Sequence, residues 1–177
     1  MKKHAALIAS VVLGLVTLLV APLATADDAN KAAAGAYMFK FTGVQQFFGP
    51  GTYVPGFATL SSDGTLTSVT GSDEAGPAGL FSVKNSAVNG VWFRTGHQSV
   101  GARALYLNFS PITGEVVSIT RLRIVADFDK DFNNGVGQFF NSIYVCPTFV
   151  TCPDPLTTAP TIPEPAVGQP FTLTRIR

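Results

Sequence analysis

The sequence contains few charged residues, few cysteines and almost no histidine. Of its 177 residues, 13% are charged, and the formal net charge is +1, whereas charged residues make up about 25% of an average domain. A nucleic-acid-binding surface needs a cluster of basic side chains, so this composition argues against a nucleic acid as a partner. The hydrophobic content of 46% argues against intrinsic disorder. A single folded domain is therefore expected.

The N-terminal segment has the pattern of a secretory signal peptide. Two lysines precede an apolar run at 7–20, and Ala-Thr-Ala at 24–26 provides the small residues that a signal peptidase recognises. The run is about 14 residues long, shorter than the roughly 20 that a membrane-spanning helix needs. We therefore expect a signal peptide at 1–26, cleavage after Ala26, and a secreted or periplasmic single domain at 27–177 that does not associate with a membrane.

The two cysteines, Cys146 and Cys152, are close together in the sequence and have no histidine near them. Because a tetrahedral zinc site needs four ligands, the pair favours a disulfide, as expected in an exported protein. Seven of the twelve prolines lie at 146–170. Proline cannot donate regularly to a β-ladder, so this segment is expected to form a long Pro-rich strap with the disulfide at its start.

Glycine-containing dipeptides divide the rest of the chain into strand-like runs. They favour tight hairpin turns, because both central residues of such turns need positive φ. The dipeptides are Asp63-Gly64, Asn89-Gly90, Thr113-Gly114 and Asn134-Gly135. The runs that flank them predict strands at 37–44, 57–60, 65–69, 81–88, 91–94, 103–109, 116–128, 138–145 and 171–176.

Sequential hairpins with a returning last strand predict an all-β fold. We expect an antiparallel up-and-down (meander) β-barrel of about eight or nine strands, because closure leaves no unpaired edge; the alternative is a β-sandwich. Such a barrel holds its own side chains or one small ligand. The 14 phenylalanines therefore either fill the core or line a cavity for a small apolar molecule. By strand position and alternation, the candidate cavity-lining residues are Phe39, Phe41, Phe93, Leu105, Leu107 and Phe109.

One short motif resembles a known group of barrels. Gly90-Val91-Trp92 is similar to the G-x-W signature of lipocalins and the wider calycin group, and the stretch at 51–128 resembles small secreted bacterial calycin-like proteins of undefined role. The resemblance implies a barrel that holds an apolar molecule. It also implies that Trp92 packs at one barrel end beneath Arg175 from a late strand. In lipocalins the motif lies near the first strand, whereas here it lies mid-chain, so the resemblance concerns architecture.

Patterns for catalysis and metal binding are weak. His97 is the one histidine after the expected cleavage site, and no G-x-S-x-G motif accompanies it. Aspartates alternate at 127–131, but an EF-hand counted from the first of them needs Gly and Glu where this chain has Phe132 and Gln138. We therefore expect no catalytic residue, no metal site and no cofactor.

Three functions remain open from the sequence, and the oligomeric state is open as well. The first is a non-catalytic barrel that binds a small apolar molecule. The second is an extracellular interaction or structural module with a filled barrel. The third is a cyclase- or isomerase-type barrel enzyme, similar to allene-oxide cyclases and dirigent proteins, with polar groups from Arg94, Arg103, Tyr106 or Glu115. A hollow interior favours the first and third, whereas an exposed aromatic patch favours the second.

Overall fold

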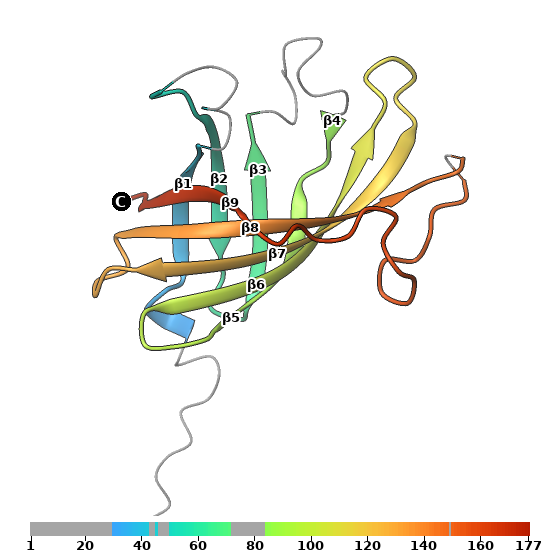
Figure 1. Ribbon diagram of the computed structural model, residues 1–177. Coiled ribbons are helices and arrows are strands. Elements are labelled where there is room, and N and C mark those ends of the chain that lie inside the picture. The colour runs from blue at the N-terminus through green and yellow to red at the C-terminus, as the bar shows by residue number, and fades with distance from the viewer. Residues whose placement is uncertain (1–29, 43–44, 46–49, 72–83, 149) are drawn as a thin grey trace, which may run out of the picture.

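The computed structural model describes residues 30–42, 45, 50–71, 84–148 and 150–177 (Figure 1). Nine strands are found in these residues: Gly35–Phe41 (β1), Val54–Leu60 (β2), Thr65–Thr70 (β3), Lys84–Asn85 (β4), Val88–Arg94 (β5), Ser99–Phe109 (β6), Val116–Phe128 (β7), Asn134–Val145 (β8) and Gln169–Arg175 (β9). The expected signal peptide at 1–26 lies outside the described residues.

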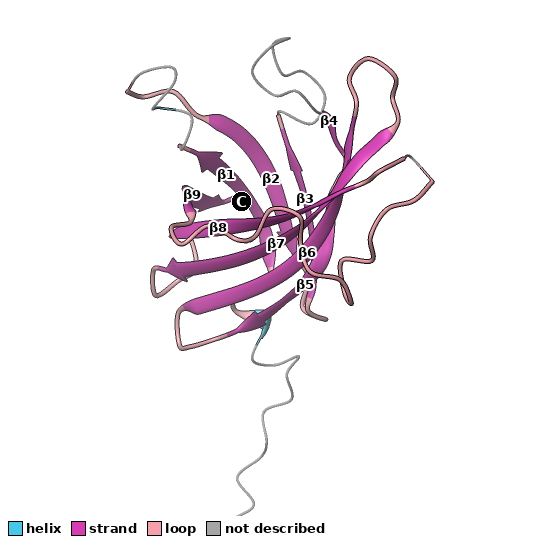
Figure 2. Cartoon of the chain, turned by 45° about the vertical axis from the view of Figure 1, so that its right-hand side comes forward, coloured by secondary structure: helices cyan, strands magenta, loops and turns pink. Residues whose placement is uncertain are grey.

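The strands form one closed antiparallel sheet. β1, β2, β3, β5, β6, β7, β8 and β9 pair with their neighbours in chain order, and β1 also pairs with β9. The two-residue β4 lies on the same side of β6 as β5 and adds to the eight strands of the ring. Figure 2 shows the strands curving around a common interior. The predicted up-and-down barrel is therefore confirmed, and the sandwich alternative is wrong.

Two of the four predicted turns are confirmed. Gly64 has a φ of 89° between β2 and β3, and Gly114 has a φ of 73° between β6 and β7. The prediction is wrong at Asn89-Gly90, which lies inside β5, and at Asn134-Gly135, which begins β8. The reversal between β7 and β8 places Phe132 at a φ of 54° instead.

Two of the alternating aspartates, Asp129 and Asp131, lie in this last reversal, whereas Asp127 lies in β7. The Asp129 carboxylate accepts hydrogen bonds from the backbone N–H groups of Asn133, at 2.8 Å, and Asn134, at 3.0 Å. These hydrogen bonds, that from Asn133 above all, hold the pKa of Asp129 below its ordinary value because they stabilise the ionised form. Asp129 therefore caps a tight turn.

Cross-strand register defines the inner face of the barrel. Residues opposite each other in neighbouring strands point to the same side of the sheet. From the buried Trp92 on β5, the register leads to Ala102 on β6, Ile124 on β7 and Phe139 on β8. The buried core includes or contacts all four residues. The side of the sheet that carries them is therefore the interior.

The segment between β8 and β9 runs over the outside of the barrel. Phe140, Ser142 and Tyr144 alternate with the inward residues of β8, so they point outward, yet all three are buried. Ile162 forms a β-bridge with Ile143 through two backbone hydrogen bonds of 2.9 and 3.0 Å. The Pro-rich segment thus pairs with the edge of β8 at Ile162, and the burial of the outward side chains shows that this outer face of the sheet is covered.

Two arginines on the outer face of β7 hold the same segment. Arg121 donates a hydrogen bond to the Pro155 carbonyl at 3.2 Å, and Arg123 forms an ion pair with Glu164. The Arg123 guanidinium also lies 3.8 Å from the centre of the Phe140 ring. Cys146 and Cys152 are joined by the predicted disulfide at the start of the segment, and that prediction is confirmed.

Candidate functional site

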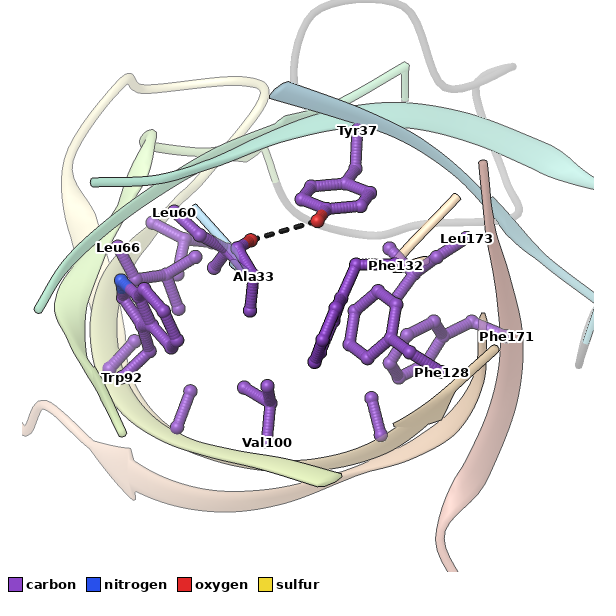
Figure 3. Close-up of a cluster of buried hydrophobic side chains, with 14 of the residues drawn as sticks. Ala33, Tyr37, Leu60, Leu66, Trp92, Val100, Phe128, Phe132, Phe171 and Leu173 are labelled. Atoms are coloured by element: carbon purple, nitrogen blue, oxygen red, sulfur yellow. Dashed lines mark hydrogen bonds between the residues drawn. The ribbon is translucent and has the colours of Figure 1, made fainter. Parts of the chain in front are cut away.

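One end of the barrel is closed by a packed group of large rings, which we call the aromatic base: Tyr37, Trp92, Phe128 and Phe132. All four are buried, with exposed fractions of 0 to 6%. The Phe128 ring packs between those of Tyr37 and Phe132, with both centroid distances at 5.4 Å. Figure 3 shows Trp92 with Leu60 and Leu66 on one side of the barrel, facing the phenylalanines of the other. This end is filled by the protein itself.

Trp92 ties the turn between β2 and β3 to the aromatic base. Its indole Nε1 donates a hydrogen bond to the Ser61 carbonyl at 2.8 Å, and its backbone N–H donates to the Gly64 carbonyl at 2.7 Å. The ring is thus buried with its one polar atom paired, which is how proteins usually accommodate tryptophan. Trp92 therefore has a structural role at this end of the barrel.

Arg175 also lies at the aromatic base, but its partner differs from the one that the calycin resemblance implies. β9 pairs with β1, so Arg175 lies opposite Tyr37, and its guanidinium is 5.8 Å from the centre of that ring. It also donates hydrogen bonds to the carbonyls of Ala32 and Ala34. The expected pairing with Trp92 is therefore wrong, because the last strand closes the barrel against the first one.

The Tyr37 hydroxyl completes the closure. It donates a hydrogen bond of 2.8 Å to the Ala33 carbonyl, which joins the short helical turn before β1 to the interior (Figure 3). Burial raises the pKa of Tyr37 above its ordinary value, and the nearby positive charge of Arg175 opposes that increase. The phenol therefore stays neutral and acts as a donor.

One wall of the interior above the base is aromatic. We call Phe39, Phe41, Phe139 and Phe171 the aromatic wall. Their rings contact in sequence across β1, β9 and β8, at centroid distances of 6.4 Å for Phe39–Phe171, 6.3 Å for Phe139–Phe171 and 5.1 Å for Phe41–Phe139. Phe39 lies over Gly56, where an added Cβ would be 2.2 Å from its ring. The glycine lets the ring lie close to the sheet.

Small residues face inward on other strands of the barrel. They are Ala58, Ser68, Gly90, Ala102, Ala104 and Ala126. Tyr106, Ile124 and Phe139 also point inward and pack against the core, yet they are only partly buried. Inward apolar side chains in the middle of long strands would be fully buried in a filled barrel. The described side chains therefore leave part of the interior uncovered above the aromatic base.

The six predicted cavity-lining residues divide by strand. Phe39 and Phe41 on β1 belong to the aromatic wall. Phe93 on β5 and Leu107 on β6 point outward, with exposed fractions of 42 and 37%. Leu105 and Phe109 share the outward alternation of Leu107. The prediction of an inward direction is wrong for these four residues, because β5 directs Trp92 inward and β6 directs Ala102, Ala104 and Tyr106 inward instead.

The polar residues considered for catalysis are not gathered at one place. Tyr106 faces the interior, whereas Arg103 lies on the outward side of β6, opposite Arg123 of β7. Glu115 is exposed near the turn before β7, and Arg94 donates to the carbonyls of Gly96 and His97. In the described ranges, no three His, Cys, Asp or Glu side chains are grouped as metal ligands.

Comparison with protein-family models, curated proteins and solved structures found no match for this chain. Within the part of the chain that the structure describes, no helix has both the length and the apolar character needed to cross a membrane. The fold and the interior define the class of protein: an eight-stranded antiparallel barrel with a filled aromatic base, an aromatic wall and an incompletely filled interior.

Proposed function

We propose that the protein binds a small apolar molecule inside its barrel, without catalysing a reaction. The observation that carries the proposal is the partial exposure of inward-facing Tyr106, Ile124 and Phe139. Covering apolar surface contributes about 25 cal/mol per Å² of area removed from water. An apolar interior closed at one end, with a few polar groups, has the usual form of a small-molecule site. The aromatic wall supplies flat contact area for such a ligand.

A specific observation also favours the interaction module as a second candidate. Phe57 on β2 and Val69 on β3 lie opposite each other on the outer face, and their exposed fractions are 54 and 46%. Exposed apolar pairs of this kind occur at protein-binding surfaces, although single exposed residues are common. This candidate gains support if the interior takes up no apolar probe.

Binding of N-phenyl-1-naphthylamine, a fluorescent apolar probe, tests the proposal. We expect saturable binding that Ser68→Leu weakens about tenfold or more, equal to about 1.4 kcal/mol. Ser68 is half-buried and points inward from β3, opposite Ala58 and Val88, so leucine there occupies the space meant for the ligand. Fluorescence titration gives the affinity, and thermal unfolding checks that the variant is folded.

Thr67→Leu is the matched control, because Thr67 is the neighbouring residue of β3 and is exposed on the outer face. It should leave probe affinity unchanged. The proposal fails if the wild-type protein shows no saturable binding. It also fails if folded Ser68→Leu binds the probe as tightly as the control does.

We also propose that the protein is exported, to the periplasm or beyond the cell. The disulfide between Cys146 and Cys152 is compatible with an oxidising compartment, because cytosolic thiols are usually kept reduced. The mature chain is then expected to begin at Asp27. Intact-mass measurement of the protein recovered from its native compartment checks this start. A mass that includes 1–26 would contradict the proposed cleavage.

A further inference from the structure

A row of polar side chains crosses the barrel interior at the end away from the aromatic base. We call it the polar band: Asn85, Asn108, Ser118, Thr120 and Asn141. Asn85 of β4 lies opposite Asn108 of β6, which lies opposite Ser118 of β7. Thr120 follows on the same face of β7, and Asn141 of β8 lies opposite the inward-facing Leu122. The band therefore spans four strands on the inner face.

The centre of the polar band is paired within itself. Asn108 is 5% exposed, and its Nδ2 donates hydrogen bonds of 2.8 Å to both Ser118 Oγ and Thr120 Oγ1. Ser118 and Thr120 are buried as well, with exposed fractions of 8 and 1%. These groups are not a solvated rim of the barrel, since little of their surface reaches water. Their hydrogen bonds fix the orientation of the Asn108 amide.

The two flanking amides have buried oxygens without a partner. Asn85 Oδ1 and Asn141 Oδ1 are shielded from solvent, and neither accepts a hydrogen bond from the described residues. Buried acceptors are nearly always paired in folded proteins, so each unpaired one calls for an explanation. Both oxygens belong to residues on the inner face, next to the interior that the proposed ligand would occupy.

We infer that the polar band binds an uncharged hydrogen-bond donor, such as a hydroxyl group, at one end of an otherwise apolar ligand. This inference rests on the proposed function and adds the chemical class of the ligand. The apolar part of the molecule lies along the aromatic wall, toward the base. Its hydroxyl lies at the band and donates to one of the two oxygens, Asn141 Oδ1 or Asn85 Oδ1, and so supplies the hydrogen bond that this oxygen lacks.

The absence of nearby charge selects a neutral group over a carboxylate. Among the described strand residues, the inward-facing cations are Arg94 and Arg175, and both lie at the aromatic base. Lys84 and Arg103 point away from the interior, as the alternation of β4 and β6 shows. A carboxylate at the polar band would lose its hydration without gaining a positive partner, and it would face the two amide oxygens. A hydroxyl has neither disadvantage.

Displacement of N-phenyl-1-naphthylamine by three compounds that share a ten-carbon chain tests this inference. The compounds are 1-decanol, decyl methyl ether and decanoate, measured at pH 8, where the carboxylate is ionised. We expect decanol to bind about tenfold more tightly than the ether, which cannot donate, and the ether to bind at least as tightly as decanoate. Isothermal titration with decanol provides a second measure of affinity.

Asn141→Leu and Asn85→Leu each remove one of the two acceptors, so one of these variants should lose the preference for decanol over the ether. Both should leave the affinity for N-phenyl-1-naphthylamine within about twofold, and thermal unfolding checks that each variant is folded. Asn89→Leu is the matched control, because Asn89 is exposed on the outer face of β5, and it should keep the full preference.

The results separate this inference from the proposed function. If the probe binds but the three compounds displace it equally, or if both band variants keep the preference for decanol, the polar band has no role in recognition. If decanoate binds most tightly, the assigned ligand class is wrong. If neither the probe nor any compound binds to the wild-type protein, the proposed function itself is overturned.

Discussion

Replacing Trp92 by alanine is expected to lower the free energy of unfolding by about 3–5 kcal/mol, the usual cost of deleting a buried aromatic side chain. Trp92 is 2% exposed and is among the largest fully buried side chains of the described residues. Its removal leaves a cavity in the aromatic base and also removes the hydrogen bond to the Ser61 carbonyl. That carbonyl then lies at the edge of the cavity without its donor.

Chemical denaturation followed by circular dichroism measures this loss. Trp92→Phe keeps much of the apolar contact but cannot donate a hydrogen bond. We therefore expect its free energy of unfolding to lie between those of Trp92→Ala and the wild type. Phe93→Ala is the positional control. Phe93 is the next residue on β5 and is 42% exposed on the outer face. Its replacement by alanine should lower the free energy of unfolding by less than about 1 kcal/mol. Equal losses for Trp92→Ala and Phe93→Ala would contradict the assigned inner face.

Gly90→Ala is expected to lower the free energy of unfolding by about 3 kcal/mol, at the upper end of the usual cost of overpacking. An added Cβ at Gly90 would lie 2.2 Å from the Arg103 carbonyl oxygen and 2.5 Å from Ala104 Cα. Both are backbone atoms of β6, so no side-chain rotation can relieve the contact. β5 and β6 would have to separate, which weakens the hydrogen bonds between them.

Gly96→Ala provides the comparison for this prediction. A Cβ at Gly96 would lie 3.4 Å from the Ser99 side chain, at the edge of ordinary contact, and Gly96 lies in the exposed turn after β5. The free energy of unfolding of Gly96→Ala should differ from that of the wild type by less than about 1 kcal/mol. Thermal and urea unfolding of both variants measure these changes in stability. A Gly90→Ala protein as stable as Gly96→Ala would show that the strands tolerate the added methyl group.

The sequence was most informative where one strand face is polar and the other apolar. β7 has the predicted bounds at 116–128, because Arg121 and Arg123 alternate with Leu122 and Ile124. Hairpin turns were predicted correctly at Gly64 and Gly114, where the backbone has positive φ. These features depend on local chemistry, so they can be read from neighbouring residues.

Gly90 shows why a dipeptide alone does not define a turn. Asn89-Gly90 has the composition of a hairpin turn, but its glycine serves a close approach to β6 within a strand. Both uses of glycine depend on the missing Cβ, and only the distant strand distinguishes them. The register between β5 and β6 is therefore information that the local sequence does not contain.

The candidate site was predicted in part, and β6 shows why the rest was missed. Both of its faces are largely apolar, and the larger residues, Leu105 and Leu107, were expected inside. The structure places the small Ala102 and Ala104 inside instead. Selecting the larger apolar side chains as the inward ones therefore gives the wrong face of β6, since the small alanines lie on its inner face. The inward polar residues Asn85 and Asn141 were not singled out, because their orphan oxygens become visible only in three dimensions.

The pairing of β1 with β9 has a consequence for how the chain reaches its native state. These strands are the first and last of the described series, and Tyr37 meets Arg175 across more than a hundred intervening residues. Contacts between such distant segments slow folding, since a large loop must close before they form. Until β9 has left the ribosome, β1 and β8 keep open edges that invite aggregation. We therefore expect ring closure to be a late event that follows synthesis of the whole chain.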